Sequence, residues 1–475
     1  MFSRTAIAVF GVAFAAAGCS VFKEAHREQE AVAPKGIGER ESGAAALDFK
    51  GRELSWLVDF AMTNRPSVVS ARLAVDDARH ALKQLAADAP IISETPWTSP
   101  DVSLSGGHSE SSAGTKLKDH KFSTDGSASA GVSLDLLVWD FGRYDAKAKA
   151  QVERVVAAEL ALVNEGFTVF GEVAKAYFTV MENHALLQVS FTNVAQFAEH
   201  LAQAEERLKA GEVNRLDVLR ARLDLAKANE RSVSASNDYT TAGAELMRAL
   251  GIDAGRGTFA DVIGTPSGDL SHVTRQFADT KFGVSEAFDF ARTNAPSLCV
   301  ARARLRAASH EVDAALADML PSVSFSASFS WADPLWYLKW GFSGAQTLFQ
   351  GFRKTTAVDR AVVAMRSAAA AVDEAEQELS ANIELAVAVR DNAVEARRTA
   401  KVSVRSAREN LQMVEEQRSV GDVSRIELSD SVSEYSAALG SRVSAFYTGQ
   451  RAEAALFALL GRYPEFKDEK GEAKK

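Results

Sequence analysis

The sequence predicts a mainly α-helical chain that consists of two internal repeats, each of which also contributes a pair of β-strands. Three observations support this prediction: segments that recur in register, long helical stretches without proline, and short stretches in which apolar and small polar residues alternate. The chain has 475 residues and a formal net charge of -9, and 47% of its residues are hydrophobic. This composition excludes a disordered or collagen-like chain, and the acidic balance argues against a nucleic-acid partner.

The two repeats are visible as pairs of matching segments that follow one another in the same order. These pairs are Asp59–Ser67 with Asp289–Ser297, Leu208–Leu216 with Arg418–Ile426, and Leu250–Gly251 with Leu460–Gly461. The spacing between partners is shorter in the last two pairs than in the first, so one deletion distinguishes the halves. Matches at both ends of a repeat indicate a duplication.

Each repeat is expected to start with an alanine-rich helix and to end with a hairpin of two long, proline-free helices. The predicted helices are residues 55–89, 143–210 and 213–250 in the first repeat, and residues 285–320, 353–420 and 423–460 in the second. Gly211 and Gly421 lie between the members of each hairpin and are expected to form tight turns.

Strands are predicted between the first helix and the hairpin of each repeat. Val323, Phe325, Phe329 and Trp331 alternate with serines, which gives a strand with one apolar and one small polar face. Four strands per chain are too few to close a barrel, so several copies are expected to complete one. The four apolar side chains would then face lipid.

The N-terminus has the features of a secretion signal. Arg4 precedes an apolar run, Thr5–Ala17, that is too short to cross a bilayer as a helix. The run leads into Ala16-Ala17-Gly18-Cys19, which resembles the lipobox of bacterial lipoproteins and implies that Cys19 is acylated. The residue after it, Ser20, points to the outer membrane. An ordinary signal peptide, cleaved near Ala17, is the alternative.

These features divide the chain into six parts. The predicted parts are a signal peptide (1–18), a lipidated linker (19–54), repeat 1 (55–251), an inter-repeat linker (252–284), repeat 2 (285–461) and a polar C-terminal tail (462–475).

From residue 55 to about residue 461 the chain resembles the TolC-like outer membrane factors. The resemblance is carried by the turns around Gly211 and Gly421 and by two strand exits, Asp140-Phe141-Gly142-Arg143 and Gln350-Gly351-Phe352-Arg353. It implies a homotrimer in which four strands per protomer form a 12-stranded transmembrane β-barrel, continued by a long periplasmic α-helical barrel. The implied function is that of the exit duct of a tripartite efflux pump or type I secretion system, with a gated pore.

The resemblance also implies roles for residues near the turns. Glu427 and Asp430 match two acidic positions that line the periplasmic aperture, where three copies would form carboxylate rings. Asp217 matches a position that helps to keep the aperture closed, but Val423 stands where its usual arginine partner would be. The candidates for a replacement partner are the nearby Arg215, Arg220 and Arg425. A solvated helix face is the alternative for the acidic pair.

The turns themselves are expected to contact a periplasmic adaptor protein, with an inner-membrane pump or ABC transporter as an indirect partner. The residues assigned to this contact are Gly211, Val213, Arg215, Gly421, Val423 and Arg425; a bare exposed turn is the alternative. The sequence indicates no cofactor, no metal ligands and no catalytic residues, and therefore no enzyme. The alternative function is a periplasmic helical-hairpin scaffold or adaptor protein without a pore.

Overall fold

The computed structural model describes residues 54–87, 89–91, 101–112, 124–211, 213–252, 283–332, 335–347, 350–420 and 425–462. All of these residues belong to one compact unit, Lys50–Lys475.

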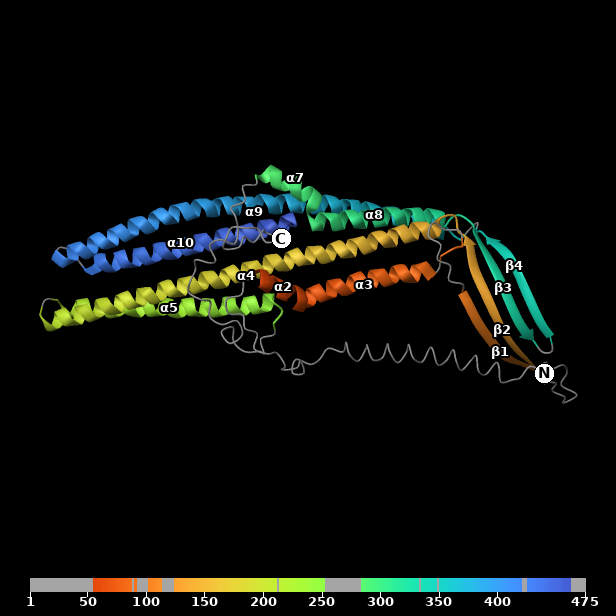
Figure 1. The fold of residues 1–475 in the computed structure, drawn as a ribbon, viewed down its shortest axis with the longest axis horizontal. Helices are drawn as coiled ribbons and strands as arrows, with labels where there is room; N and C mark the ends of the chain where they lie inside the picture. The colour runs from red at the N-terminus through yellow and green to blue at the C-terminus, as the bar shows by residue number, and fades with distance from the viewer. Residues whose placement is uncertain are drawn as a thin grey trace. The chain divides into compact units, whose positions relative to one another are not determined.

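The two halves of this unit contain the same elements in the same order (Figure 1). The first half consists of α2 (Leu54–Asn64), α3 (Pro66–Ala87), β1 (Asp101–Ser112), β2 (Thr124–Trp139), α4 (Arg143–Lys209) and α5 (Arg215–Ala249). The second consists of α7 (Val284–Asn294), α8 (Pro296–Ala317), β3 (Ser322–Ala332), β4 (Leu335–Ala345), α9 (Arg353–Val420) and α10 (Arg425–Leu460). This order confirms the two internal repeats.

The first helical segment of each repeat is not one helix, as the sequence suggested, but two. The break falls at Arg65 in the first repeat and at Ala295 in the second, directly before a proline. Ala295 has an extended conformation, with φ -62° and ψ 120°. The cause is steric, because a proline ring disfavours the helical conformation of the preceding residue and lacks the N–H that a continuous helix needs.

The end of each repeat packs against this proline break. Gly251 and Gly461 follow α5 and α10 with positive φ angles of 76° and 66°. The Gly461 Cα lies so close to Pro296 that a Cβ on it would be 2.7 Å from the proline Cδ. At Gly251, a Cβ would lie 3.2 Å from the Cα of Arg65. The matching Leu-Gly and Asn-x-Pro segments of the sequence are therefore the two sides of one repeated contact.

The strands form one antiparallel sheet in the order β1-β2-β3-β4. Directly opposed residues have side chains on the same face. Phe325 is opposite Leu136 and Phe342, which continues the apolar face across three strands. On the other face serines meet, and the hydroxyl oxygens of Ser103 and Ser133 lie 2.6 Å apart. The sheet thus has one apolar face and one face of mainly small polar residues, as the alternation predicts, with Tyr337 and Lys339 of β4 as larger members of the second face.

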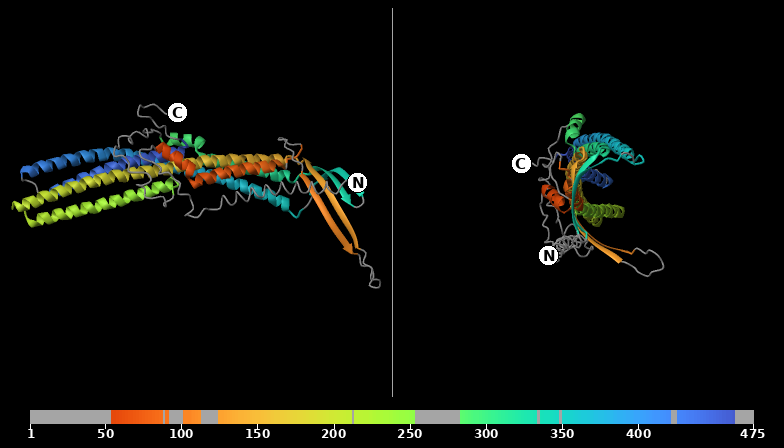
Figure 2. Two further views of the ribbon diagram at one scale, coloured as in Figure 1. Left: turned by 60° about the horizontal axis from the view of Figure 1, so that its bottom comes forward. Right: turned by 90° about the vertical axis from the view of Figure 1, so that its right-hand side faces the viewer.

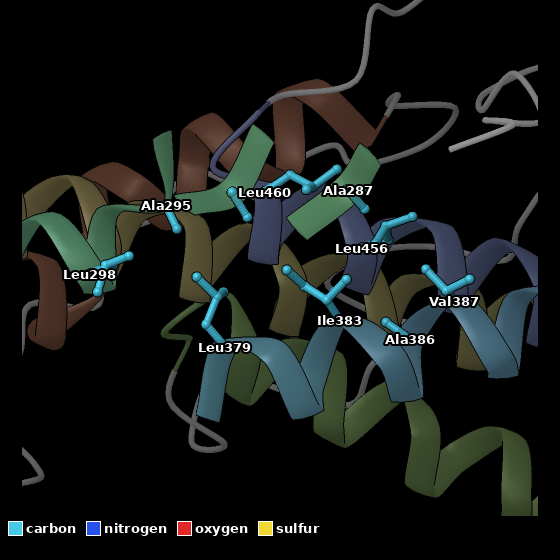
Figure 3. Packing of buried hydrophobic residues seen from close by; sticks show 10 residues of the cluster. Ala287, Ala295, Leu298, Leu379, Ile383, Ala386, Val387, Leu456 and Leu460 are labelled. Atoms are coloured by element: carbon cyan, nitrogen blue, oxygen red, sulfur yellow. The ribbon is translucent and has the colours of Figure 1, made fainter. Parts of the chain in front are cut away.

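The long helices form two hairpins, α4/α5 and α9/α10, that run away from the strands (Figure 2). Near the proline break of the second repeat, a hydrophobic cluster joins α7, α8, α9 and α10 (Figure 3). Its fully buried members include Ala287, Leu298, Ile383 and Leu456. A second cluster lies toward the turns and holds the two hairpins together through residues of all four helices, namely Phe197, Ala228, Leu411, Leu428 and Val432.

None of the helices in the described ranges combines the length and the apolar character that crossing a membrane would require.

Candidate functional site

The junction between strands and long helices is stabilised by two aspartates. The carboxylate of Asp140, which is buried, accepts a hydrogen bond of 2.7 Å from the backbone N–H of Tyr144 in the first turn of α4. Asp318 follows α8, and its carboxylate accepts a hydrogen bond of 3.1 Å from Arg143. The Nζ of Lys354, at the start of α9, donates to the Asp318 carbonyl oxygen. Asp318 therefore connects the first residues of α4 with those of α9.

The two strand exits have an unusual backbone conformation. Phe141 and Gly142 have φ angles of 56° and 85°, and Gly351 and Phe352 have 57° and 63°. Positive φ is uncommon for a residue with a Cβ, and it is rarer still for a bulky one. Both repeats therefore turn from strand into helix by the same left-handed pair, which accounts for the similar Asp-Phe-Gly-Arg and Gln-Gly-Phe-Arg segments.

The turn between α4 and α5 contains three of the predicted contact residues. Gly211 has a φ of 78° and its N–H donates to the Leu208 carbonyl oxygen at 3.1 Å, which ends α4. Val213 is half-buried and Arg215 is exposed. In the second turn, Gly421 and Val423 lie outside the described residues, as does the side chain of Arg425, the first residue of α10.

Asp217 has a local structural role. Its Oδ2 accepts a hydrogen bond of 3.2 Å from the backbone N–H of Asn214, the residue that precedes α5. A carboxylate in the first helical turn also interacts favourably with the positive end of the helix dipole. Asp217 thus stabilises the start of α5, and its predicted part in closing an aperture stays a prediction.

Glu427 and Asp430 share the exposed face of the first turns of α10. Leu428 between them is only 2% exposed and belongs to the hydrophobic cluster that joins the hairpins. At 100° per residue, the two carboxylates therefore point away from this cluster. Three positions apart on one exposed face, they are placed as the sequence spacing predicts.

A link between the hairpins lies next to this acidic pair and was not predicted. The Ser429 hydroxyl donates a hydrogen bond of 3.1 Å to Oδ2 of Asp224 in α5. Neither residue is among the arginines named as candidates for a closing contact. No spacing rule could have identified the link, because the two residues are brought together only by the packing of separate hairpins.

Further from the turns, half-buried charged side chains connect α4 with α10. Glu182 and Arg451 form an ion pair across these helices. Burial, with Tyr177 and Glu182 close by, raises the pKa of the neighbouring Tyr447 hydroxyl to about 12. This phenol therefore stays neutral at physiological pH and packs as part of the helix interface.

The chain matches a known protein family over most of its length. A model of the family described as outer membrane efflux protein matches residues 57–252 and 288–462, which together make up more than half of the sequence. The chain belongs to the outer membrane efflux protein family.

A curated relative of this efflux protein is the outer membrane efflux protein BepC of Brucella suis biovar 1 (strain 1330). The two sequences are 24% identical over 205 residues, which cover 43% of this chain and 42% of BepC. The aligned region therefore spans less than half the length of that relative.

Solved structures that share the fold of this efflux protein include the following two. One is CusC, studied for the conformational changes that accompany folding and transmembrane channel formation, with a TM-score of 0.76 at 20% identity over 90% of this chain and 96% of CusC. The other is the CmeC outer membrane channel of Campylobacter jejuni, with a TM-score of 0.74 at 14% identity over 87% of each chain. At these identities the likeness shows the fold, and it confirms the predicted architecture of helices and strands.

Family membership confirms the predicted resemblance and the predicted class, an outer membrane efflux protein and not an enzyme. In the ranges that the structure describes, no group of three His, Cys, Asp or Glu side chains could hold a metal ion. The predicted lipidation residue, Cys19, lies outside those ranges.

One buried titratable residue of this efflux protein gives a pH prediction. His184 in α4 is 8% exposed, and its ring centroid lies 5.6 Å from that of Tyr239 in α5. Burial lowers the pKa of the His184 imidazole below its usual value. As the pH falls through that usual value, the unfolded chain takes up a proton that the folded chain excludes, so stability should fall with it. Replacing His184 by Phe should reduce this loss of stability at acid pH.

The measurement is the thermal midpoint of helical circular dichroism between about pH 7.5 and 5, where an unperturbed imidazole of pKa about 6.5 titrates. The matched control is His80→Phe on α3, because His80 is exposed. If both variants keep the wild-type dependence on pH, the protonation of His184 does not limit the acid stability of the α4/α5 pair.

Proposed function

We propose that the protein is the exit duct of a tripartite efflux pump or type I secretion system, and that it passes substrates to the cell exterior through a gated trimeric pore. The observation that carries this proposal is the sheet. It combines an apolar face, a small polar face and two edges, β1 and β4, each of which has one partner strand among the described elements. If each edge pairs with the edge strand of a neighbouring copy, no unpaired edge remains.

Three copies would make a barrel of twelve strands, within the range known for transmembrane barrels. In that barrel Val323, Phe325, Phe329 and Trp331 face lipid, because they share a face with the exposed aromatic side chains of β4. The serines and Lys339 then face the lumen. Continuous apolar bands outside and polar residues inside are what such barrels need.

The helical hairpins also present apolar side chains that a neighbouring copy would cover. On α5, Leu216, Leu219 and Leu223 are about half exposed and lie three and four positions apart, which places them on one stripe. On α9, Val402 and Met413 are similarly exposed. Such stripes favour association with further helices over a free surface.

In this assembly the aperture lies at the turns. Three copies each of Glu427 and Asp430 would form rings of like charge, which attract cations and repel anions at a constriction. The four-helix cluster and the Asp224–Ser429 hydrogen bond would hold the hairpins of each protomer together in the closed state. Asp224–Ser429 takes the place of the arginine link that Val423 removes.

Further parts of the proposal concern partners and anchoring. The turn residues Gly211, Val213 and Arg215, with their counterparts in the second repeat, would contact a periplasmic adaptor. An acyl group on Cys19 would add a membrane anchor to the barrel, and the mass of the mature N-terminus tests it. The limits of the two repeats, 55–251 and 285–461, are proposed as the duplicated units.

The deciding experiment is single-channel conductance of the purified protein in planar bilayers. Wild type should conduct with a preference for cations, and multivalent cations added on the turn side should block it. Replacing both Glu427 and Asp430 by Ala should abolish this block while the pore remains. Replacing Asp224 by Ala should instead raise the conductance several-fold and leave the block intact, because it releases the link and keeps the rings.

Two results would contradict the proposal at different levels. No conductance from a correctly assembled wild-type protein would favour a helical scaffold without a pore. An unchanged cation block in the double variant would mean that these two residues do not line the aperture, whatever the pore does.

A further inference from the structure

A cavity of about 730 Å³ lies in the middle of the helical part, between α4, α9 and α10, with Pro296 and Ser297 of α8 at one end. Its size falls in the range of sites that bind drug-sized ligands. None of the described residues that line it belongs to α7, although α7 packs against α9 and α10 in the cluster of Figure 3. The cavity therefore opens on a different side of α10 from the one that α7 covers.

The hollow exists because small residues line its α10 wall. Ala452, Ala455 and Ala458 repeat every three positions there, and Gly171 faces them from α4. A Cβ on Gly171 would lie 3.3 Å from the Cβ of Ala458, so the helices already approach closely at this point. Side chains of this size cannot fill the space above them. Leu385, on the α9 rim, is 64% exposed and offers an apolar surface to a guest.

The charges around the cavity balance. Glu172 forms an ion pair with Arg65, and Arg451 forms one with Glu182. The other two charged residues of the lining are Lys175 on α4 and Glu378 on α9, one of each sign. Neither a cation nor an anion therefore meets a net complementary charge. The rest of the polar lining is neutral, with side chains that both donate and accept hydrogen bonds, namely Asn164, Thr168, Ser297, Asn382 and Thr448.

We propose that this cavity binds uncharged, drug-sized amphiphiles, with their apolar part against the alanine wall and Leu385 and their polar groups on the neutral rim. An apolar floor with a few convergent polar groups is the usual composition of small-molecule sites. That such compounds are among the exported substrates rests on the proposed duct function. The binding site itself does not.

The test uses the full-length protein in lipid nanodiscs and N-phenyl-1-naphthylamine, a neutral fluorescent amphiphile, with the signal of empty nanodiscs subtracted. Ala455→Trp should weaken binding at least tenfold, because the indole occupies the cavity from an exposed position. Ala437→Trp, at an exposed position of the same helix outside the lining, is the matched control and should bind as wild type does.

A second variant tests the charge balance without adding bulk. Glu378→Gln leaves the Lys175 charge uncompensated, so binding of the anionic analogue anilinonaphthalene sulfonate should strengthen several-fold while binding of the neutral probe changes less than twofold. The assignment is overturned if Ala455→Trp binds the neutral probe as wild type does, or if wild type prefers the anionic probe.

Failure of the inference and failure of the duct function give different results. If the wild-type protein conducts and Ala455→Trp binds the neutral probe as wild type does, the duct function stands and the binding site in the cavity is rejected. If the wild-type protein does not conduct, but binding of the neutral probe is lost in Ala455→Trp and kept in Ala437→Trp, the duct function is rejected and the binding site stands.

Discussion

Replacing Phe329 by Asp should remove most of the protein from the outer membrane in assembled form. Phe329 is 48% exposed within one chain, and its ring centroid lies 5.0 Å from that of Trp336 on the neighbouring strand. A carboxylate on the lipid face of a barrel costs on the order of 2 kcal/mol near the midplane, and loss of the aromatic contact adds about 1 kcal/mol. Three copies would multiply this cost. The measurement is the fraction of protein found folded and assembled in outer membranes.

The matched control is Ser328→Asp, the adjacent residue on the opposite face. Ser328 is directly opposite Lys339 on β4, so a carboxylate there gains a cross-strand partner of opposite charge. Assembly should stay close to the wild-type level. Ser326 is a poorer control because it is opposite Asp135, where a second carboxylate would be repelled. Equal loss in Phe329→Asp and Ser328→Asp would mean that the face assignment is wrong.

Replacing Gly461 by Ala should destabilise the helical part more than any other single methyl group added at a described glycine. The new Cβ would lie 2.7 Å from Cδ of Pro296 and 3.0 Å from the carbonyl oxygen of Asn294, and φ is 66°. Left-handed strain costs about 1–2 kcal/mol and forced overpacking about 1–3 kcal/mol. The expected loss is therefore about 2–5 kcal/mol, measured as a lower thermal midpoint of helical circular dichroism.

Two other glycines provide a graded series for this measurement. At Gly251 the equivalent Cβ would lie 3.2 Å from the Cα of Arg65, so the loss should be smaller. At Gly211 an added Cβ would have no neighbouring atom within 4 Å, so only the strain of its φ of 78° would remain. The order of destabilisation should be Gly461, Gly251, Gly211. A Gly211→Ala variant as unstable as Gly461→Ala would show that φ, and not the contact with the proline, decides the effect.

The sequence was sufficient for features that are encoded locally or encoded twice. The serine–aromatic alternation around Phe325 has a period that only a strand satisfies, and its pairing partners continue the same faces. The Leu-Gly and Asn-x-Pro segments are each present in both halves, and each pair forms one contact in the structure. The prediction of a single first helix was wrong because the steric effect of Pro66 and Pro296 outweighs the helical pattern around them.

Other features depend on how separate helices are placed, and no local pattern contains that information. Ser429 and Asp224 are 205 positions apart and meet only because the α9/α10 hairpin packs against the α4/α5 hairpin. The cavity is equally invisible in sequence, since its alanines at positions 452, 455 and 458 are typical of any tightly packed helix. Asp217 shows the converse case, in which one residue matches a family position and also has an ordinary capping role.

The carboxyl and carbonyl oxygens of Asp318 bind Arg143 and Lys354 at the starts of α4 and α9, so both long helices are anchored at one point. Helix α4 has 67 residues, which at 1.5 Å per residue makes a lever about 100 Å long. A tilt of about 5° at that anchor moves the far end of such a lever by about 9 Å. In the proposed duct, a displacement of that size at the turns would widen the aperture while the strand register at the other end stays unchanged.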